Sequence, residues 1–187
     1  MPERRKTMNF LAKGAKSNIM EEKELITMEQ KKIRLATEAD QERILEIYEI
    51  ARQFMRSNGN PTQWNNGYPQ KDLLEEDIRL NRLYVVEAED EIKGVFVFFI
   101  GADPTYAYIE GSWRSETPYG VIHRIAGVGG GIFHAALEFC LSQINHMRID
   151  THENNKPMQH VVEKAGFSRR GIIYVEDGTP RIAYDRI

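Results

Sequence analysis

The feature that most constrains this chain is a glycine-rich turn between two apolar segments, in the stretch VIHRIAGVGGGIFHAALEFC from Val121 to Cys140. Four glycines fall within five positions: Gly127, Gly129, Gly130 and Gly131. The residues before them have the composition of a strand, and those after them place apolar side chains on one stripe at helical spacing. The stretch therefore predicts a strand that leads through a glycine loop into a helix from about residue 131.

A glycine loop in front of a helix can bind an anion. The first amide groups of a helix have no partners within the helix, and glycines allow a phosphate to approach the backbone closely. The loop that binds nucleoside triphosphates requires Lys followed by Ser or Thr after its last glycine, where this chain has Ile132 and Phe133. The dinucleotide-binding loop requires a small residue in place of Ile132. Two interpretations remain: an anion cradle of another kind, or a flexible connection that only makes a turn.

The rest of the sequence alternates between strand and helix patterns. Thr37 and Asp40 resemble a capping box at the start of a helix that the residues SNGN bring to an end. A second helix is predicted for KDLLEEDIRL, and a short helix between Met158 and Lys164. Strands are predicted for KIRLAT, RLYVVEAE, IKGVFVFFIG, YAYIEGSW, GVIHRIA, MRIDTH, GIIYVED and RIAYDRI. This order predicts an α+β sheet with helices on both of its faces.

Composition argues against several classes of function. A formal net charge of -3 and an isoelectric point near 6.0 give no basic surface for nucleic acid. No apolar stretch approaches the roughly 18 residues of a transmembrane helix, so no contact with a membrane is predicted. The single Cys140 fits a reducing compartment, and the five histidines include no close pairs, so we expect no metal site. These observations predict a cytoplasmic protein.

The first 30 residues differ from the rest of the chain. They are polar, rich in lysine and without sustained periodicity, so we expect a flexible or loosely helical N-terminal tail over residues 1–30. Residues 31–187 are then expected to form one globular domain, which is long enough to bury a core.

Three stretches together resemble the GNAT superfamily of acyl-CoA-dependent N-acyltransferases, over about residues 32–187. HRIAGVGGGIFHAAL stands where that family has a strand, a pyrophosphate-binding loop and a long helix. RIDTHENNKPMQHVVEKAGF looks like the family's next strand, an Asn, a short helix and a closing Gly-Phe, here Gly166 and Phe167. IRLATEADQERILEIYE looks like the family's first strand and helix. The resemblance implies a mixed, mostly antiparallel central sheet with helices on both faces, in three α/β/α layers.

The resemblance also implies a function and a set of site residues. An acetyl group would move from acetyl-CoA, the acyl donor, to an unidentified primary amine by direct attack in a ternary complex, in a monomer or a homodimer and without a metal. A backbone amide of the splayed central strand, in the stretch from Ile125 to Gly127, would stabilise the oxyanion. The residues that bind the cofactor would be Ile125, Ala126, Gly127, Val128, Gly129, Gly130, Gly131, Ile132 and Asn155.

Three positions depart from the family's pattern. With Gly131 aligned to the first glycine of the motif, Val128 stands where the family usually has Arg or Gln, and Phe133 stands at its second glycine. Val162 stands where the family often has a tyrosine that protonates the departing thiolate. These departures support an alternative function: a non-catalytic acyl-CoA-binding or regulatory module that kept the fold and lost the general acid.

Two residues are candidates for the base that takes the proton of the amine. His123 and Glu110 are both expected on central strands, and an imidazole with an ordinary pKa of about 6.5 suits proton transfer at neutral pH. His123 could instead be a half-buried histidine bonded to a backbone carbonyl. Glu110 could instead be a solvated residue or a partner of Arg124.

Other polar and aromatic residues have two interpretations each. His152 lies near the expected path of pantetheine, or orients its own loop by a hydrogen bond. The loop NPTQWNNGYPQ and the segment before the glycine strand could wall an acceptor pocket or pack on the sheet through four aromatic residues: Trp64, Tyr68, Trp113 and Tyr119.

Overall fold

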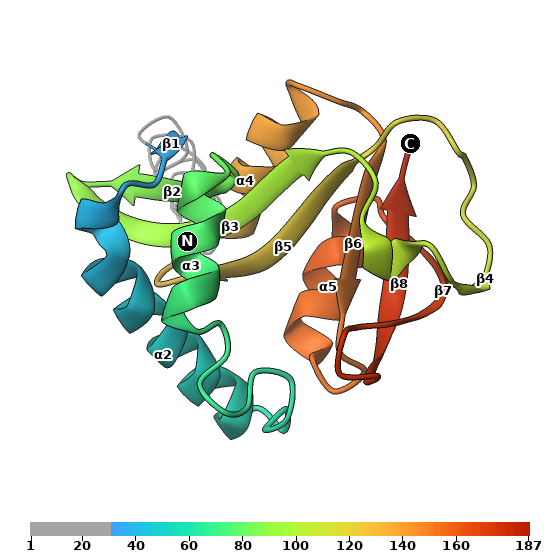
Figure 1. Ribbon diagram of the computed structural model, residues 1–187, viewed down its shortest axis with the longest axis horizontal. Coiled ribbons are helices and arrows are strands. Elements are labelled where there is room, and N and C mark those ends of the chain that lie inside the picture. The colour runs from blue at the N-terminus through green and yellow to red at the C-terminus, as the bar shows by residue number, and fades with distance from the viewer. Residues whose placement is uncertain (1–30) are drawn as a thin grey trace, which may run out of the picture.

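One mixed sheet of eight strands runs through the part of the chain that the computed structural model describes, residues 31–187 (Figure 1). In chain order the strands are β1 (Lys32–Leu35), β2 (Leu83–Ala88), β3 (Glu91–Ile100), β4 (Glu110–Gly111), β5 (Gly120–Gly127), β6 (Met147–Thr151), β7 (Ser168–Tyr174) and β8 (Pro180–Arg186). Across the sheet their order is β1-β2-β3-β5-β6-β8-β7-β4. All neighbours are antiparallel except β5 and β6, which confirms the expected mixed, mostly antiparallel sheet.

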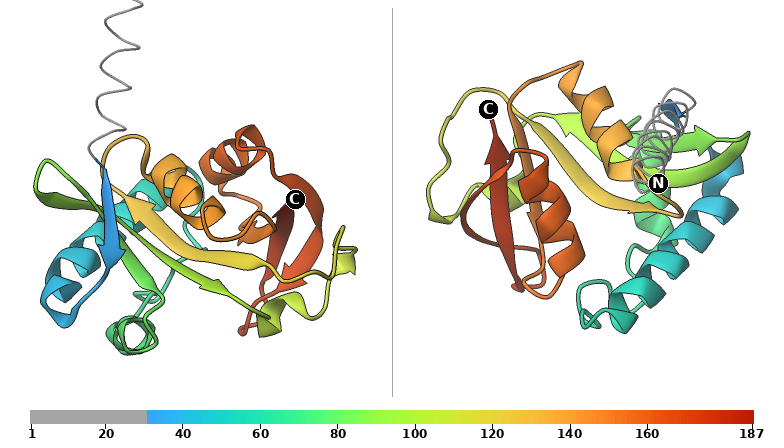
Figure 2. Two further views of the ribbon diagram at one scale, coloured as in Figure 1. Left: turned by 90° about the horizontal axis from the view of Figure 1, so that it is seen from above. Right: turned by 180° about the vertical axis from the view of Figure 1, so that it is seen from behind.

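Helices cover both faces of the sheet (Figure 2). On one face pack α2 (Gln41–Ser57) and α3 (Lys71–Arg79), and on the other pack α4 (Ile132–Leu141) and α5 (Lys156–Lys164). Two short 3-10 helices are η1 (Glu38–Asp40) and η2 (Pro104–Tyr106). The expected three-layer α/β/α arrangement is confirmed.

Three apolar clusters hold the layers together. The largest lies between the sheet and helices α4 and α5 and includes Phe96, Ile122 and Val162, all buried. A second cluster lies under α2 and α3 and includes Ala126 of β5, and a third packs η2 against Val121 of β5 and against β7 and β8. On the face of α2, α3 and η2, the residues of β5 between Val121 and Ala126 therefore lie at the boundary of two apolar clusters.

The start of α2 follows its sequence signal. Asp40 Oδ2 accepts hydrogen bonds from the backbone and the hydroxyl of Thr37, at 2.8 and 2.9 Å. Arg34 binds both carboxylate oxygens of Asp40, and these hydrogen bonds outweigh burial and lower the pKa of Asp40 to about 2. The predicted capping box is confirmed, and it is reinforced from β1.

The segment YAYIEGSW differs from its prediction. Only Glu110 and Gly111 form a strand, and this strand lies at the outer edge of the sheet beside β7. The chain turns before it because Asp103 accepts the amide hydrogen bond of Thr105 at 2.8 Å, and because Pro104 has no N–H to donate to a ladder. The prediction that Glu110 lies on a central strand is wrong.

The predicted N-terminal tail, residues 1–30, lies outside the described residues. The described part begins at Lys31, directly before β1. None of its helices combines the length and the hydropathy that a membrane span requires.

Candidate active site

The two parallel strands in the middle of the sheet separate soon after they meet. β5 and β6 pair at three positions, of which the last joins Ile122 to Ile149. Beyond these residues the two strands diverge, as Figure 1 shows, and β6 continues beside β8. Their facing edges therefore leave a gap in the hydrogen-bond ladder at the carboxyl ends of both strands. In open α/β sheets this is where ligands bind.

β5 carries a bulge beside this gap. Its pairing with β3 jumps between Val95 and Val97, so that Arg124 and Ile125 together stand opposite one residue of β3. Arg124 has a φ of +49°, in the left-handed region that residues other than glycine rarely adopt. A bulge bends its strand and redirects side chains, and this bulge begins directly after His123.

His123, one of the two predicted bases, lies at the gap between two carboxylates. Its Nε2 is 2.6 Å from Oδ2 of Asp103, and its Nδ1 is 3.6 Å from Oδ1 of Asp150. Asp103 lies in the loop after β3, and Asp150 is the first residue of β6 beyond the last pair with β5. His123 is thus bonded to a carboxylate rather than to the backbone carbonyl considered from the sequence.

Asp103 is held as a charged group. Its Oδ1 accepts hydrogen bonds from the amide and the hydroxyl of Thr105, at 2.8 and 2.6 Å. Burial by itself would raise the pKa of Asp103, but the hydrogen bond and charge of His123, together with the bonds from Thr105, outweigh it and lower that pKa to about 2. A carboxylate that is negative at neutral pH fixes the orientation of the imidazole ring.

One carboxylate oxygen of Asp150 accepts a hydrogen bond. Its Oδ1 accepts from the hydroxyl of Tyr106 at 2.8 Å, while Oδ2 has no donor among residues 31–187. Burial, followed by the charges of Asp150 and Asp103, raises the pKa of Tyr106 well above its usual value, so this hydroxyl keeps its proton. The sequence did not predict Asp150, because one carboxylate inside a strand has no spacing signal. We call His123, Asp103, Asp150 and Tyr106 the polar cluster.

Arg124 anchors the bulge to α3. Its Nη2 donates to Oδ2 of Asp77 at 2.6 Å, and its Nη1 donates to the hydroxyl of Tyr68 at 3.3 Å. Asp77 is buried and also accepts from Arg82 at 2.6 Å. Burial by itself would lower the pKa of Arg124, but Tyr68 and Asp77 outweigh it and raise that pKa. This guanidinium is bonded to α3 and to the loop before it, and not to Glu110.

Glu110 lies apart from the polar cluster. Three strands, β6, β8 and β7, stand between its strand and β5. The exposed Glu110 side chain accepts a hydrogen bond from the hydroxyl of Tyr174 at 2.7 Å. The structure does not bring the two predicted bases, Glu110 and His123, together.

The glycine loop presents open backbone. A Cβ atom added at Gly129 or Gly130 would meet no atom of residues 31–187 within 4 Å, so within this part of the chain the space beside both residues is open to a ligand. Gly129 and Gly131 have φ values of +93° and +76°, which favour glycine. Gly127 differs, because a Cβ there would lie 2.6 Å from the side chain of Ile132. Gly127 is needed for close packing of α4, and the glycines after it leave the backbone accessible.

Several predicted cofactor-binding residues can offer only backbone atoms. The side chains of Ala126 and Ile132 are buried, and Ile125 packs against the same cluster as Ile132. Val128 is partly exposed but carries no polar group. Among these residues, only backbone groups and the shape of the loop are therefore available to a ligand.

Lys31 brings a cation to the glycine loop. Its Nζ lies 3.0 Å from the position that a Cβ on Gly131 would occupy, at the start of α4. The family's usual basic residue is missing at Val128, so this lysine places a positive charge at the loop from another element. No local pattern predicted this contact, because Lys31 precedes β1 and only the folded sheet brings that end of β1 near the end of β5.

Asn155 lies at the start of α5. Its Oδ1 accepts from the amide of Met158 at 3.2 Å, and its Nδ2 donates to Oε1 of Gln63 at 2.9 Å. This second bond ties the loop between α2 and α3 to α5. In the same loop, Trp64 packs edge-on against Tyr48. A contact between Asn155 and the cofactor stays a prediction.

Other candidates from the sequence take part in internal contacts. His152 accepts from the amide of Asn154 at 3.1 Å, which orients its loop. The guanidinium of Arg148 lies between the rings of Trp113 and Tyr119, 4.1 and 3.8 Å from their centroids. These two aromatic side chains pack around a buried arginine.

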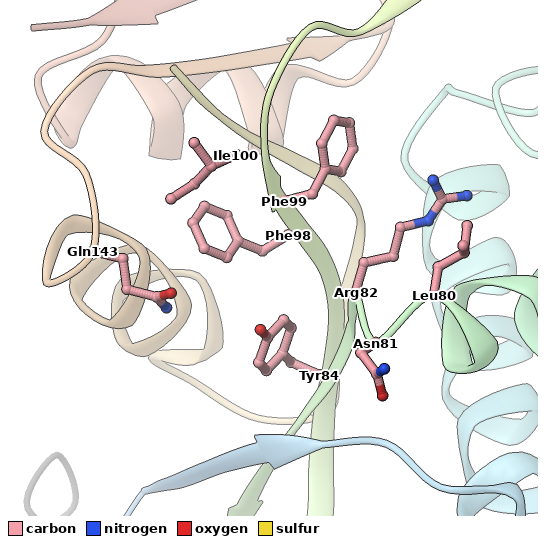
Figure 3. A pocket seen from close by; sticks show the side chains of 8 residues that line it. All are labelled: Leu80, Asn81, Arg82, Tyr84, Phe98, Phe99, Ile100 and Gln143. Atoms are coloured by element: carbon pink, nitrogen blue, oxygen red, sulfur yellow. The ribbon is translucent and has the colours of Figure 1, made fainter. Parts of the chain in front are cut away.

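A surface hollow of about 370 Å³ lies elsewhere on the described chain (Figure 3). Figure 3 shows Phe98 and Gln143 on one side of the strands, and Arg82 and Leu80 on the other. The lining residues are Leu80, Asn81, Arg82, Tyr84, Phe98, Phe99, Ile100 and Gln143. None of them carries a carboxylate or an imidazole, so the hollow offers no strong base at neutral pH. The polar cluster is therefore the better candidate for acid–base chemistry.

Solved structures resemble this fold, although no protein-family model and no curated protein matches the sequence. A GNAT-family acetyltransferase from Streptococcus agalactiae is 28% identical, with a TM-score of 0.76, over 84% of this chain and 95% of that chain. A proposed acetyltransferase from Staphylococcus aureus is 27% identical, with a TM-score of 0.59, over 82% and 97% of the two chains.

A more distant neighbour is AAC(6')-Ib, whose structure contains ribostamycin and coenzyme A. It is 19% identical to this chain, with a TM-score of 0.59, over 84% of this chain and 93% of that chain. At this identity the likeness concerns the fold alone.

Proposed function

We propose that this chain, whose fold resembles that of GNAT-family acetyltransferases, transfers an acetyl group from acetyl-CoA to a primary amine by direct attack. The observation that carries the proposal is the place of His123, which lies where β5 and β6 separate, bonded to one carboxylate and facing another. The structural relatives support acetyltransferase activity in general. The donor, the acceptor and the base are inferred from the site.

The glycine loop has the features that a pyrophosphate needs. The free space beside Gly129 and Gly130 lets a phosphate approach the backbone at the start of α4. Lys31 adds a positive charge at the same place. Amides at a helix N-terminus and an ammonium group both favour an anion. Acetyl-CoA held by these groups would supply the thioester carbonyl that the amine attacks.

The gap between β5 and β6 leaves backbone groups available beside the polar cluster. From His123 onward, β5 makes no pairs with β6. The stretch from Ile125 to Gly127 therefore has an edge free of the β6 ladder. We infer that an amide of this stretch stabilises the negative charge that develops on the carbonyl oxygen.

His123 is placed to receive the proton of the amine. An alkyl amine resembles lysine, whose pKa is about 10.4, so at neutral pH it arrives as an ammonium ion and cannot attack until it loses a proton. Because ionised Asp103 can only accept a hydrogen bond, Nε2 of His123 carries the proton between them. Nδ1 of the neutral ring is then a proton acceptor at the gap.

Acetyl transfer to an ammonium group forms one bond, breaks one bond and releases protons. A C–N bond forms, the C–S bond breaks, and the ammonium loses two protons in all. One proton leaves before attack, through Nδ1 of His123, and reaches solution. The other ends on the thiol of CoA.

Val162 is the observation that favours a second function. It is fully buried and has no proton to give to the departing thiolate, in the position where the family often has a tyrosine. Without a general acid, the chain would bind acyl-CoA and serve as a regulatory module, and the polar cluster would have no catalytic role.

Turnover separates the two functions. Release of CoA thiol from acetyl-CoA is measured with a panel of primary amines, and binding of CoA is measured by calorimetry. We expect thiol release that requires an amine, with one acetyl group added to that amine by mass spectrometry. Binding of CoA without release for any amine would contradict acetyl transfer and support the regulatory module. Absence of CoA binding would contradict both functions.

A further inference from the structure

Between His123 and Asp150 the polar cluster has acceptors but no donor. Nε2 of His123 carries the proton that is shared with Asp103, so Nδ1 faces Asp150 as an acceptor. The 3.6 Å between Nδ1 and Oδ1 of Asp150 is too long for a hydrogen bond. Oδ1 already accepts from Tyr106, and Oδ2 has no donor within residues 31–187. Nδ1 of His123 and the carboxylate of Asp150 are therefore two hydrogen-bond acceptors that face each other without a donor from the described chain between them.

The described chain brings no second cation to this place. His123 is the one basic side chain of residues 31–187 that lies within 4.0 Å of Asp150. Arg124 is bonded to Asp77, and Arg148 lies between two aromatic rings. The Asp150 side chain is 10% exposed, and a carboxylate so buried is unfavourable without a charged partner. A positively charged ligand would supply that partner.

The acceptors match an ammonium group better than a metal ion. Asp103 and His123 are in direct contact at 2.6 Å, which leaves no room for an ion between them. In the described residues no group of three or more ligand side chains is arranged to hold a metal. A primary ammonium has one positive charge and three N–H donors, which complement an imidazole nitrogen and a carboxylate.

We propose that Asp150 binds the acceptor substrate as the ammonium form of an aliphatic primary amine, between its carboxylate and Nδ1 of His123. The assignment rests on the proposed acetyl transfer and gives it a substrate class and an acceptor-binding residue. One N–H of the ammonium donates to Oδ2 of Asp150. A second N–H donates to Nδ1 of His123 and gives up its proton there, so that the imidazolium lies between Asp103 and Asp150.

Asp150→Asn is the direct test. It removes the charge and keeps an oxygen that can accept from Tyr106, so we expect the fold to persist. Steady-state kinetics are measured with a linear alkyl amine and with an aniline, which is neutral at neutral pH. We expect the KM for the alkyl amine to rise about 10- to 100-fold, as for loss of a charge-assisted hydrogen bond, and the KM values for acetyl-CoA and the aniline to stay unchanged.

Asp90→Asn is the matched control. It removes the same charge from the exposed turn between β2 and β3, where the φ of +59° suits Asn as well as Asp. We expect this variant to keep all three KM values. Equal kinetics for Asp150→Asn and Asp90→Asn would overturn the proposal. An equal loss with the aniline and the alkyl amine would also overturn it, because the site would not recognise charge.

A second measurement covers the case in which Asp150→Asn does not fold. With the unmodified protein, the alkyl amine is compared with the alcohol of the same shape as a competitive inhibitor. The neutral alcohol should bind about tenfold more weakly or worse, and equal binding would overturn the proposal.

Failure of the proposed function gives a different result. In that case the unmodified protein transfers no acetyl group to any amine. Calorimetric binding of the alkylammonium ion to the unmodified protein, compared with Asp90→Asn and Asp150→Asn, then still decides the ammonium site. Binding that only Asp150→Asn loses supports the site, and no binding to the unmodified protein overturns it.

Discussion

The two faces of the sheet are built by different means at the point where β5 and β6 separate. On the face of α4 and α5, apolar side chains such as Ile125 and Ile132 pack together, and the glycine loop presents its backbone. On the face of α2, α3 and η2, charged side chains fix one another, in the polar cluster and in the pair of Arg124 with Asp77. The first face offers shape and amide groups, and the second offers charge.

Because of this difference, we expect the two faces to respond differently to substitution. A backbone site keeps its amide groups when side chains around it change, which is how Val128 can stand in place of a basic residue. A charged cluster depends on every member, because removing one leaves a buried group without its partner. We therefore expect single substitutions to have larger effects on the charged face than on the glycine loop.

The largest effect is expected for His123→Gln. Loss of the base should lower kcat/KM for an alkyl amine by about 10²- to 10⁴-fold, the usual range for general acid–base catalysis. The affinity for CoA, measured by calorimetry, should not change, because His123 lies on the charged face. Near-normal rates in this variant would mean that the proton leaves through water.

The next effect concerns stability. Asp77→Ala leaves the buried Arg124 without its carboxylate and should lower the free energy of unfolding by about 3–5 kcal/mol in a urea titration. Arg82→Gln is the control, since it keeps the Arg124 pair and removes only the bond of Asp77 to the more exposed Arg82, so a smaller loss is expected. Equal losses in the two variants would show that the Arg124 pair is not the stronger anchor.

On the glycine loop we expect a smaller effect. In Gly130→Val the added Cβ meets no atom of residues 31–187 within 4 Å, and Gly130 does not have the left-handed φ of its neighbours, so we expect the melting temperature to stay unchanged. Affinity for CoA should fall about tenfold or more, since several N-terminal anion contacts of about 0.3–2 kcal/mol each are obstructed together. Unchanged affinity would mean that the loop only makes a turn.

Lys31→Gln should have a still smaller effect. Loss of one partly exposed charge near the loop should weaken CoA binding by about two- to fivefold, and the difference should shrink as salt is added. Lys32→Gln is the matched control, because its ammonium lies 3.9 Å from Glu87 on β2. Equal weakening by both substitutions would remove the special role of Lys31.

The smallest expected effect is a change in how the free energy of unfolding depends on pH. The pKa of Asp103 is lowered to about 2 in the folded chain, so its ionised form stabilises the fold above the ordinary Asp pKa of about 3.9. That contribution is lost as the pH falls toward 2. Asp103→Asn should therefore lose less unfolding free energy between about pH 4 and pH 2 than the unmodified chain. If the free energy of unfolding fell equally with pH in Asp103→Asn and in the unmodified chain, the assignment of Asp103 as a charged partner of His123 would be wrong.

Local sequence patterns were enough to predict most helices and strands and the residues that begin and end them. Helical and strand periodicity, the capping box of Thr37 and the glycines before α4 depend on residues a few positions apart, and each predicted its element. The same local patterns placed His123 on a central strand and implied the family. They failed for Glu110, because a short apolar alternation cannot distinguish a central strand from an edge.

Which charged groups come into contact depends on the packing of distant segments. Asp103 and Asp150 reach His123 from a loop and from a neighbouring strand, and Lys31 reaches the glycine loop from the other edge of the sheet. These contacts depend on strand order, on the register of β5 with β6 and on the point where the two separate. No local pattern encodes those quantities, because they are set by how distant segments pack to bury their apolar faces.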